Sequence, residues 1–159
     1  MGKEAKAISK NNIIIRALLS GLIATLVMTL LMFIMRAELG VPFIPELIAQ
    51  SFFPLVSTVT RYTLYAMLIH LALGTFWGFC FIYIASKTKI KRLAVAVLLY
   101  SIFLWVMFSA FALPLLGFGF FGKYLAGIPV IGEAALLVYY IVFGLVLYPF
   151  TAASNRERY

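Results

Sequence analysis

Four long apolar stretches constrain the fold of this chain more than any other feature. They cover residues 13–35, 62–86, 93–116 and 131–152, and each reaches the length of about 20 residues that a helix needs to cross a bilayer. The chain is 65% hydrophobic and 11% charged, whereas soluble domains are about 45–50% apolar and about 25% charged. We therefore expect a single all-α transmembrane domain over residues 1–159, folded as a four-helix bundle in the cell membrane.

The basic residues predict the orientation of these helices, because short cytoplasmic loops are enriched in Lys and Arg. Most of them lie near the amino terminus, between the second and third stretches, or in the carboxy-terminal tail: Lys3, Lys6, Lys10, Arg16, Lys87, Lys89, Lys91, Arg92, Arg156 and Arg158. The remaining connections hold only Arg36, Arg61 and Lys123. We expect both termini to be cytoplasmic. Since the net charge of +8 is gathered in clusters between apolar stretches, it indicates a membrane surface and not a nucleic acid as partner.

The connection between the first two stretches contains a shorter helical signal. Pro45 precedes the mainly apolar residues 46–53, and proline suits the first turn of a helix. We expect a short interfacial helix here, either flat on the outer leaflet or folded back over the bundle. The other outer connection, residues 117–132, is rich in Gly and Phe and is expected to be interfacial as well.

Small residues at a spacing of four predict where the helices approach one another closely. The second stretch holds Gly74 and Gly78, and the first holds the pairs Ser20 with Ala24 and Gly21 with Thr25. We interpret Gly21, Ala24, Gly74 and Gly78 as packing positions between the first two helices. The alternative is a contact face for a second copy or another subunit.

His70 is the single histidine and lies within the second apolar stretch. Ionisable residues inside a membrane are functional candidates, although a neutral histidine that is hydrogen-bonded inside the bundle is the simpler interpretation. The sharper alternative is haem ligation. Several methionines would offer a second ligand: Met28, Met32, Met35, Met67 and Met107.

Glu133 lies at the start of the fourth stretch. A carboxylate in the first turn of a helix is favoured by the helix dipole, and it would pair with Lys123 or Arg61. The functional alternative makes Glu133 and His70 two steps of a proton or cation path that begins at the outer surface.

Catalytic patterns are absent from the sequence. The chain has no Asp, no catalytic Ser/His/acid set, no phosphate-binding loop and no metal-ligand spacing. Its single cysteine, Cys80, excludes a disulfide within the chain. We therefore expect a protein that is not an enzyme and that binds no metal or resident cofactor, unless His70 holds a haem.

The order of several short motifs resembles that of the YagU-like small inner-membrane proteins, a family of unknown function. The matching elements are Gly21-Leu22-Ile23-Ala24, Ala37-Glu38, Val41-Pro42 with Pro45, His70, Leu113-Pro114-Leu115-Leu116-Gly117 and Glu133. The resemblance implies a four-helix membrane protein and supplies no activity. Extra histidines and the longer first outer loop that some members have are absent from this chain.

Three functions follow as hypotheses. The first is a non-catalytic accessory subunit of a larger membrane complex, for instance a respiratory one, with other membrane subunits or further copies of the chain as partners. The second is a small oligomeric channel or proton-linked transporter that uses His70 and Glu133. The third is a haem-binding electron carrier.

Overall fold

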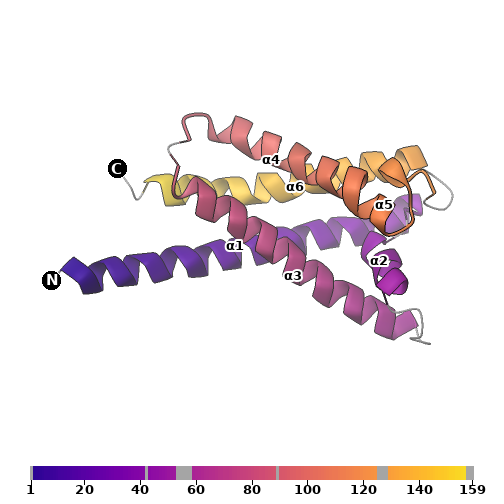
Figure 1. Cartoon of the computed structure of the whole chain (residues 1–159), viewed down its shortest axis with the longest axis horizontal. Helices are drawn as coiled ribbons and strands as arrows, with labels where there is room; N and C mark the ends of the chain where they lie inside the picture. Colours follow the sequence, from indigo (N-terminus) through magenta and orange to yellow (C-terminus); the bar gives the residue numbers. More distant parts are fainter. Residues whose placement is uncertain (1, 42, 53–58, 89, 125–128, 157–159) are drawn as a thin grey trace.

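Helices make up nearly all of the described chain (Figure 1). The computed structural model describes residues 2–41, 43–52, 59–88, 90–124 and 129–156, with side chains over 13–41, 43–51, 63–88, 90–124 and 131–153. No strand occurs within these ranges. The elements are α1 (Gly2–Leu39), α2 (Ile44–Phe52), α3 (Val59–Ala85), α4 (Leu93–Met107), the π-helical turn η1 (Phe108–Ala112), α5 (Leu113–Leu115), the 3-10 turn η2 (Phe120–Gly122) and α6 (Pro129–Arg156).

Four helical segments are long and apolar enough to cross a membrane, which confirms the all-α prediction and its four long helices. They are Ile13–Leu39, Thr63–Ala85, Leu93–Leu115 and Ile131–Ala153. The first continues past the predicted residue 35 because charged side chains are tolerated in its last turn, where they reach polar surroundings. It ends where Gly40, with φ of +65°, donates its N–H to the carbonyl of Arg36, a common glycine helix stop.

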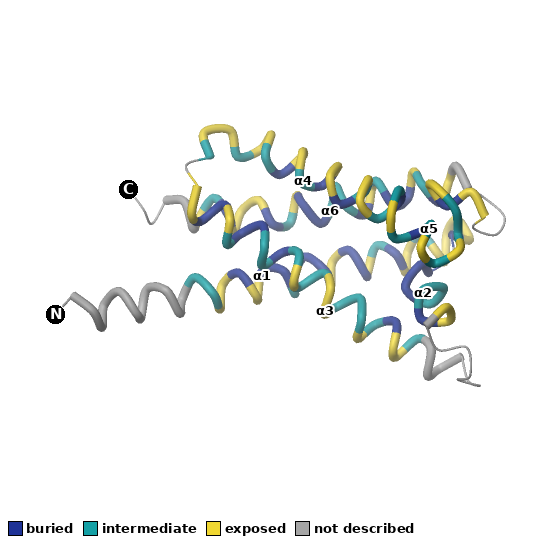
Figure 2. The backbone as a smooth tube through the Cα atoms, viewed as in Figure 1, coloured by how far each residue is buried: buried dark blue, intermediate teal, exposed yellow. Residues whose placement is uncertain are grey.

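The long helices form two pairs that share a central contact. α1 packs against α3, α4 packs against α6, and α1 and α6 join the two pairs. In the apolar window of each span, 39% of the residues are buried in α1 and α6, against 17% in α3 and 22% in the α4 span. α1 and α6 therefore form the middle of the bundle, and α3 and α4 flank it (Figure 2).

α3 and α4 meet near their connecting turn and diverge beyond it (Figure 1). Near the turn, the Tyr100 hydroxyl donates to the carbonyl of Trp77 at 2.7 Å, and the Tyr100 ring stacks on Phe81 at 4.6 Å between centroids. Farther along, α3 stays with α1 and α4 stays with α6. The bundle is consequently open on the side between α3 and α4.

Glycines allow the backbones of α1 and α3 to touch. A Cβ atom added at Gly21 would lie 2.6 Å from the carbonyl oxygen of Thr75, and one added at Gly78 would collide with the Cα of Gly21. Gly74 faces the side chain of Thr25, and Ala24 is fully buried. Three of the four predicted packing residues, Gly21, Gly74 and Gly78, thus lie at the α1–α3 crossing.

Buried hydroxyls near this crossing find partners within their own helix. Thr25 Oγ1 donates to the Gly21 carbonyl at 2.7 Å, and Thr29 Oγ1 donates to the Thr25 carbonyl at 2.7 Å. Such bonds to the carbonyl four residues earlier satisfy a hydroxyl in an apolar setting. Both hydroxyls are therefore hydrogen-bonded although they lie where the helices touch.

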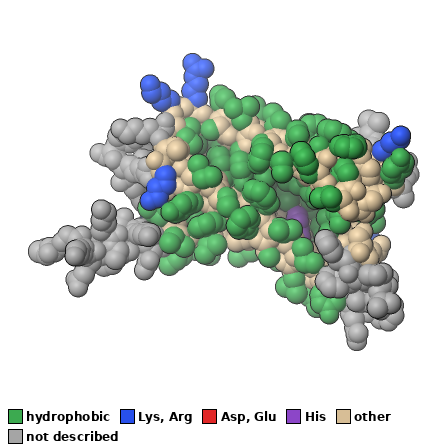
Figure 3. Space-filling model, viewed as in Figure 1, with side chains coloured by type: hydrophobic (Ala, Val, Ile, Leu, Met, Phe, Trp, Pro, Cys, Tyr) green, Lys and Arg blue, Asp and Glu red, His purple; other side chains and the backbone are tan. Residues whose placement is uncertain are grey.

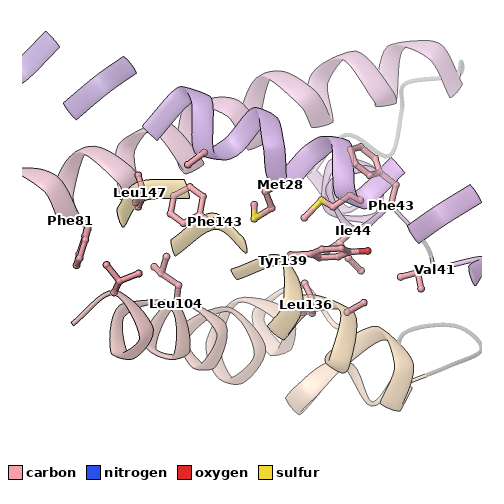
Figure 4. Packing of buried hydrophobic residues seen from close by; sticks show 14 of the residues in the cluster. Met28, Val41, Phe43, Ile44, Phe81, Leu104, Leu136, Tyr139, Phe143 and Leu147 are labelled. Carbon is pink, nitrogen blue, oxygen red and sulfur yellow. The ribbon is translucent and has the colours of Figure 1, made fainter. Parts of the chain in front are cut away.

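Large side chains from α6 fill the space between the two pairs (Figure 4). Leu136, Tyr139, Phe143 and Leu147 are buried and gather beside Met28 of α1. A second glycine contact, not anticipated from the sequence, brings α6 against α4: a Cβ at Gly144 would collide with the hydroxyl of Ser101.

The glycine contact between α1 and α3 predicts a steric cost for a single methyl group. We expect Gly21→Ala to lower the free energy of unfolding by about 1–3 kcal/mol, the usual cost of overpacking, because the new Cβ meets backbone and not a movable side chain. Thermal unfolding of the purified chain in detergent measures the effect.

Gly132→Ala is the matched control, because Gly132 is also a helical glycine but has no atom of the described residues within 4 Å of its added Cβ. We expect this variant to be as stable as the wild type or more stable. Equal melting temperatures for the two variants would contradict the contact.

Candidate functional site

Glu133 lies in a polar cluster between α6 and α4. Its Oε2 accepts a hydrogen bond from Ser109 Oγ at 2.8 Å and another from the indole Nε1 of Trp105 at 3.2 Å. Its Oε1 is buried and has no hydrogen-bond partner among the described residues. One oxygen is therefore held by two donors, and the other is free to accept or to carry a proton.

The expected ion pair between Glu133 and Lys123 does not form. Lys123 is exposed, and its ammonium lies over the ring of Tyr124 at 5.5 Å. The side chain of Arg61, the other expected partner, lies outside the described ranges. Glu133 faces the neighbouring helix, and the neutral donors that it meets there come from α4 and η1.

A π-helical turn carries Ser109 in this cluster. η1 widens the helix just before Pro114, whose ring in a regular α-helix would clash with the carbonyl of Ala110. π turns are rare and frequently occur at functional sites. Ser109 is fully buried within this turn, and it is one of the two donors to Glu133.

Phe121 contacts this cluster through Trp105 and has a strained backbone. It adopts φ of 50° and ψ of 41°, a left-handed conformation that is uncommon for a bulky residue. Its ring packs edge-on against Trp105 with centroids 5.6 Å apart. Such backbone strain costs about 1–3 kcal/mol and persists only where contacts hold it, so the Trp105 contact helps to fix this turn.

His70 lines a cavity of about 110 Å³ inside the bundle. The wall is built by α1, α2, α3, α4, η1 and α6, including Met28, Ile48 and Tyr140. Its Nε2 is buried and has no hydrogen-bond partner among the described residues. The space-filling view shows the histidine at the floor of a hollow between apolar side chains (Figure 3).

The structure does not bring His70 and Glu133 into contact. Glu133 bonds to α4 and η1, and His70 lines the cavity beside α3. Tyr140 relates the two sites. It lines the His70 cavity, and it follows Glu133 by seven residues, which is about 10 Å along α6. The ring of Phe108 packs against Tyr140 at 6.2 Å between centroids. The two predicted site residues therefore occupy two separate sites.

A third polar cluster, which the sequence analysis did not anticipate, ties α2 to the bundle. Glu46 Oε2 accepts from Arg36 at 2.8 Å, and Glu46 Oε1 accepts from Thr63 at 2.7 Å. Val41 and Phe43, just before α2, are buried. α2 packs against α3, so the cluster holds this short helix beside the bundle.

Comparisons with known protein families, curated proteins and solved structures found no match to this chain. The resemblance to YagU-like proteins stays a prediction. The described residues contain no group of three or more His, Cys, Asp or Glu side chains that could hold a metal ion.

The Glu133 cluster predicts opposite results for two substitutions. Glu133→Gln keeps an oxygen that can accept from Trp105 and Ser109, and it avoids burying a carboxylate, so we expect stability equal to or above that of the wild type. Glu133→Leu leaves the buried hydroxyl of Ser109 and the partly buried indole N–H of Trp105 without a partner, and we expect a loss of about 1–3 kcal/mol.

Thermal unfolding in detergent distinguishes the two variants. Trp105→Phe adds a check, because it removes one of the two donors and should give an intermediate loss. Equal melting temperatures for Glu133→Leu and Glu133→Gln would show that the two hydrogen bonds do not stabilise the fold.

Proposed function

We propose that this chain is a multi-pass protein of the cell membrane, with both termini in the cytoplasm. Exposed large apolar side chains cover the flanks of the long helices, and in the space-filling view they fill the surface between the charged ends (Figure 3). A soluble monomer rarely exposes apolar patches this large. The most favourable environment for these flanks is lipid.

The arrangement of the chain supports the orientation inferred from Lys and Arg. Both termini and the turn between α3 and α4, which holds Lys87, Lys91 and Arg92, lie at one end of the bundle (Figure 1). α2 and η2 lie at the other end. Since basic residues favour the cytoplasmic side, the end with the termini is assigned to the cytoplasm and the end with α2 to the outside.

Within the membrane, we propose that the protein acts as a non-catalytic subunit of a larger assembly. The observation that carries this proposal is an aromatic outer cap, defined as residues 118–124. Phe120 is 69% exposed and Tyr124 is 66% exposed, while the strained Phe121 anchors the turn on Trp105. Ordered, exposed aromatic side chains are typical of binding hot spots, and a turn held under strain favours a binding role over a loose linker.

The experiment is purification of the tagged chain in mild detergent from its native membranes. We expect another membrane protein to co-purify in a fixed ratio. With the double variant Phe120→Ala/Tyr124→Ala, we expect the amount of this partner to fall at least tenfold. Phe76→Ala is the matched control, because Phe76 is an exposed aromatic residue on the flank of α3. A chain that runs alone or only with copies of itself contradicts the proposal, as does equal retention of the partner by all variants.

A second function, proton-linked or cation transport, is favoured by one observation. His70 Nε2 and Glu133 Oε1 are both buried without a partner, and a proton or cation would satisfy them. On this function, proton flux into proteoliposomes falls at least tenfold in His70→Ala and in Glu133→Gln. Glu46→Gln is the control, because Glu46 belongs to the separate cluster with Arg36. Flux that is unchanged in the first two variants removes both residues from the function.

Haem binding fits the His70 cavity poorly. Met28 lines the same cavity and would be the second ligand. The volume of this cavity is about 110 Å³, below the range of about 300–1,000 Å³ that is usual for cofactor sites. No step of the proposed function depends on haem.

A further inference from the structure

Two cavities on the open side of the bundle adjoin each other. The His70 cavity and a larger one of about 400 Å³ share Ile48, Leu73, Trp77, Leu104, Phe108 and Tyr140 in their walls. We name the combined space the α3–α4 groove. The larger part continues along η1 and α5 to Leu115, which is 87% exposed, so the groove opens sideways toward the lipid.

The polarity of the groove limits what binds there. None of the described side chains that line it belongs to Lys, Arg, Asp or Glu. At its inner end, His70 presents a buried Nε2 without a partner, and an unpaired buried polar atom costs about 1–3 kcal/mol. An occupant that brings one uncharged hydrogen-bonding group to His70 recovers this cost, whereas a charged headgroup would remain uncompensated.

The narrow inner end of the groove favours a slender occupant over a transmembrane helix of another protein. The His70 cavity measures about 110 Å³, whereas a helix about 10 Å in diameter fills roughly 420 Å³ in each turn. A flexible apolar chain, by contrast, follows a narrow space along η1 and α5. The occupant is therefore a lipid-like molecule that enters from the membrane.

The walls near His70 favour a flat head. Trp77, Phe108, Tyr140 and Phe143 all line the His70 cavity, and aromatic side chains pack well against a conjugated ring by offset stacking or edge-to-face contact. We propose that the α3–α4 groove binds an isoprenoid quinone. A ring carbonyl accepts a hydrogen bond from His70 Nε2 in the tautomer that carries its proton there, and the isoprenoid tail lies along η1 toward Leu115.

This site is independent of the aromatic outer cap and of its partner. Binding of a quinone requires no second protein, and loss of the partner leaves the groove intact. The proposal concerns binding alone, and it invokes no electron transfer.

The test uses the full chain in nanodiscs of phosphatidylcholine, titrated with decylubiquinone. Quenching of tryptophan fluorescence reports binding, since Trp77 lines the groove. We expect saturable quenching in the wild type. His70→Leu should bind roughly fivefold to tenfold more weakly, the loss expected for one hydrogen bond. His70→Gln keeps an N–H donor and should bind within about twofold of the wild type.

A second pair of variants tests the groove without touching His70. Ala112→Phe fills the larger part of the groove and should weaken binding at least fivefold. Ala72→Phe places the same side chain at an exposed position on α3 and should leave binding unchanged.

Three results would overturn the proposal. The first is quenching by decylubiquinone that rises linearly without saturation in the wild type, which is partition into lipid alone. The second is wild-type affinity in both His70→Leu and Ala112→Phe. The third is competition by farnesol, a chain alcohol without a ring, at the same potency as the quinone, which would assign the groove to a different lipid.

Discussion

The backbone contact between Gly21 and Gly78 determines where α3 lies, and the rest of the bundle follows from that position. In lipid, the hydrophobic effect gives helices no reason to associate, so close packing supplies much of the attraction. Small residues on both helices let α1 and α3 approach until a Cβ at Gly78 would collide with Gly21. Because this contact holds α3 against α1, α4 packs mainly with α6.

The opposite pair is joined by different chemistry. α4 meets α6 through the small contact between Ser101 and Gly144 and through the hydrogen bonds that Glu133 accepts from Trp105 and Ser109. A buried carboxylate oxygen is costly unless it accepts hydrogen bonds, so the two bonds to Oε2 hold α4 and α6 in one rotation relative to each other. The two pairs therefore have separate attachments, and the space between α3 and α4 stays open.

The long helices and one of their contacts could be predicted from the sequence. Apolar length alone defines the four spans, and the spacing of Gly74 and Gly78 indicates a close helix contact because small residues let two backbones approach. Both features are local. Each depends only on residues within one stretch of the chain, so it can be predicted from that stretch alone.

The hydrogen-bond partners of the buried polar side chains could not be predicted from the sequence, because they depend on how distant helices are rotated relative to each other. The donors to Glu133 lie 24 and 28 residues earlier in the chain, and one of them lies in a π turn that shifts the helix register before Pro114. The Glu46 cluster joins three elements in the same way. The groove could not be predicted either, because it arises where two helices fail to pack.

The central claim is that α3 and α4 are separated by a groove that opens to lipid. A spin label at position 73, in a chain with Cys80→Ala, measures this directly in liposomes, because Leu73 lines both parts of the groove. We expect frequent collisions of the label with oxygen, which concentrates in the hydrocarbon, and few with a water-soluble nickel chelate. Rare collisions with both reagents would mean that α3 and α4 close against each other, and frequent collisions with the nickel chelate would mean that water fills the space; either result contradicts the account.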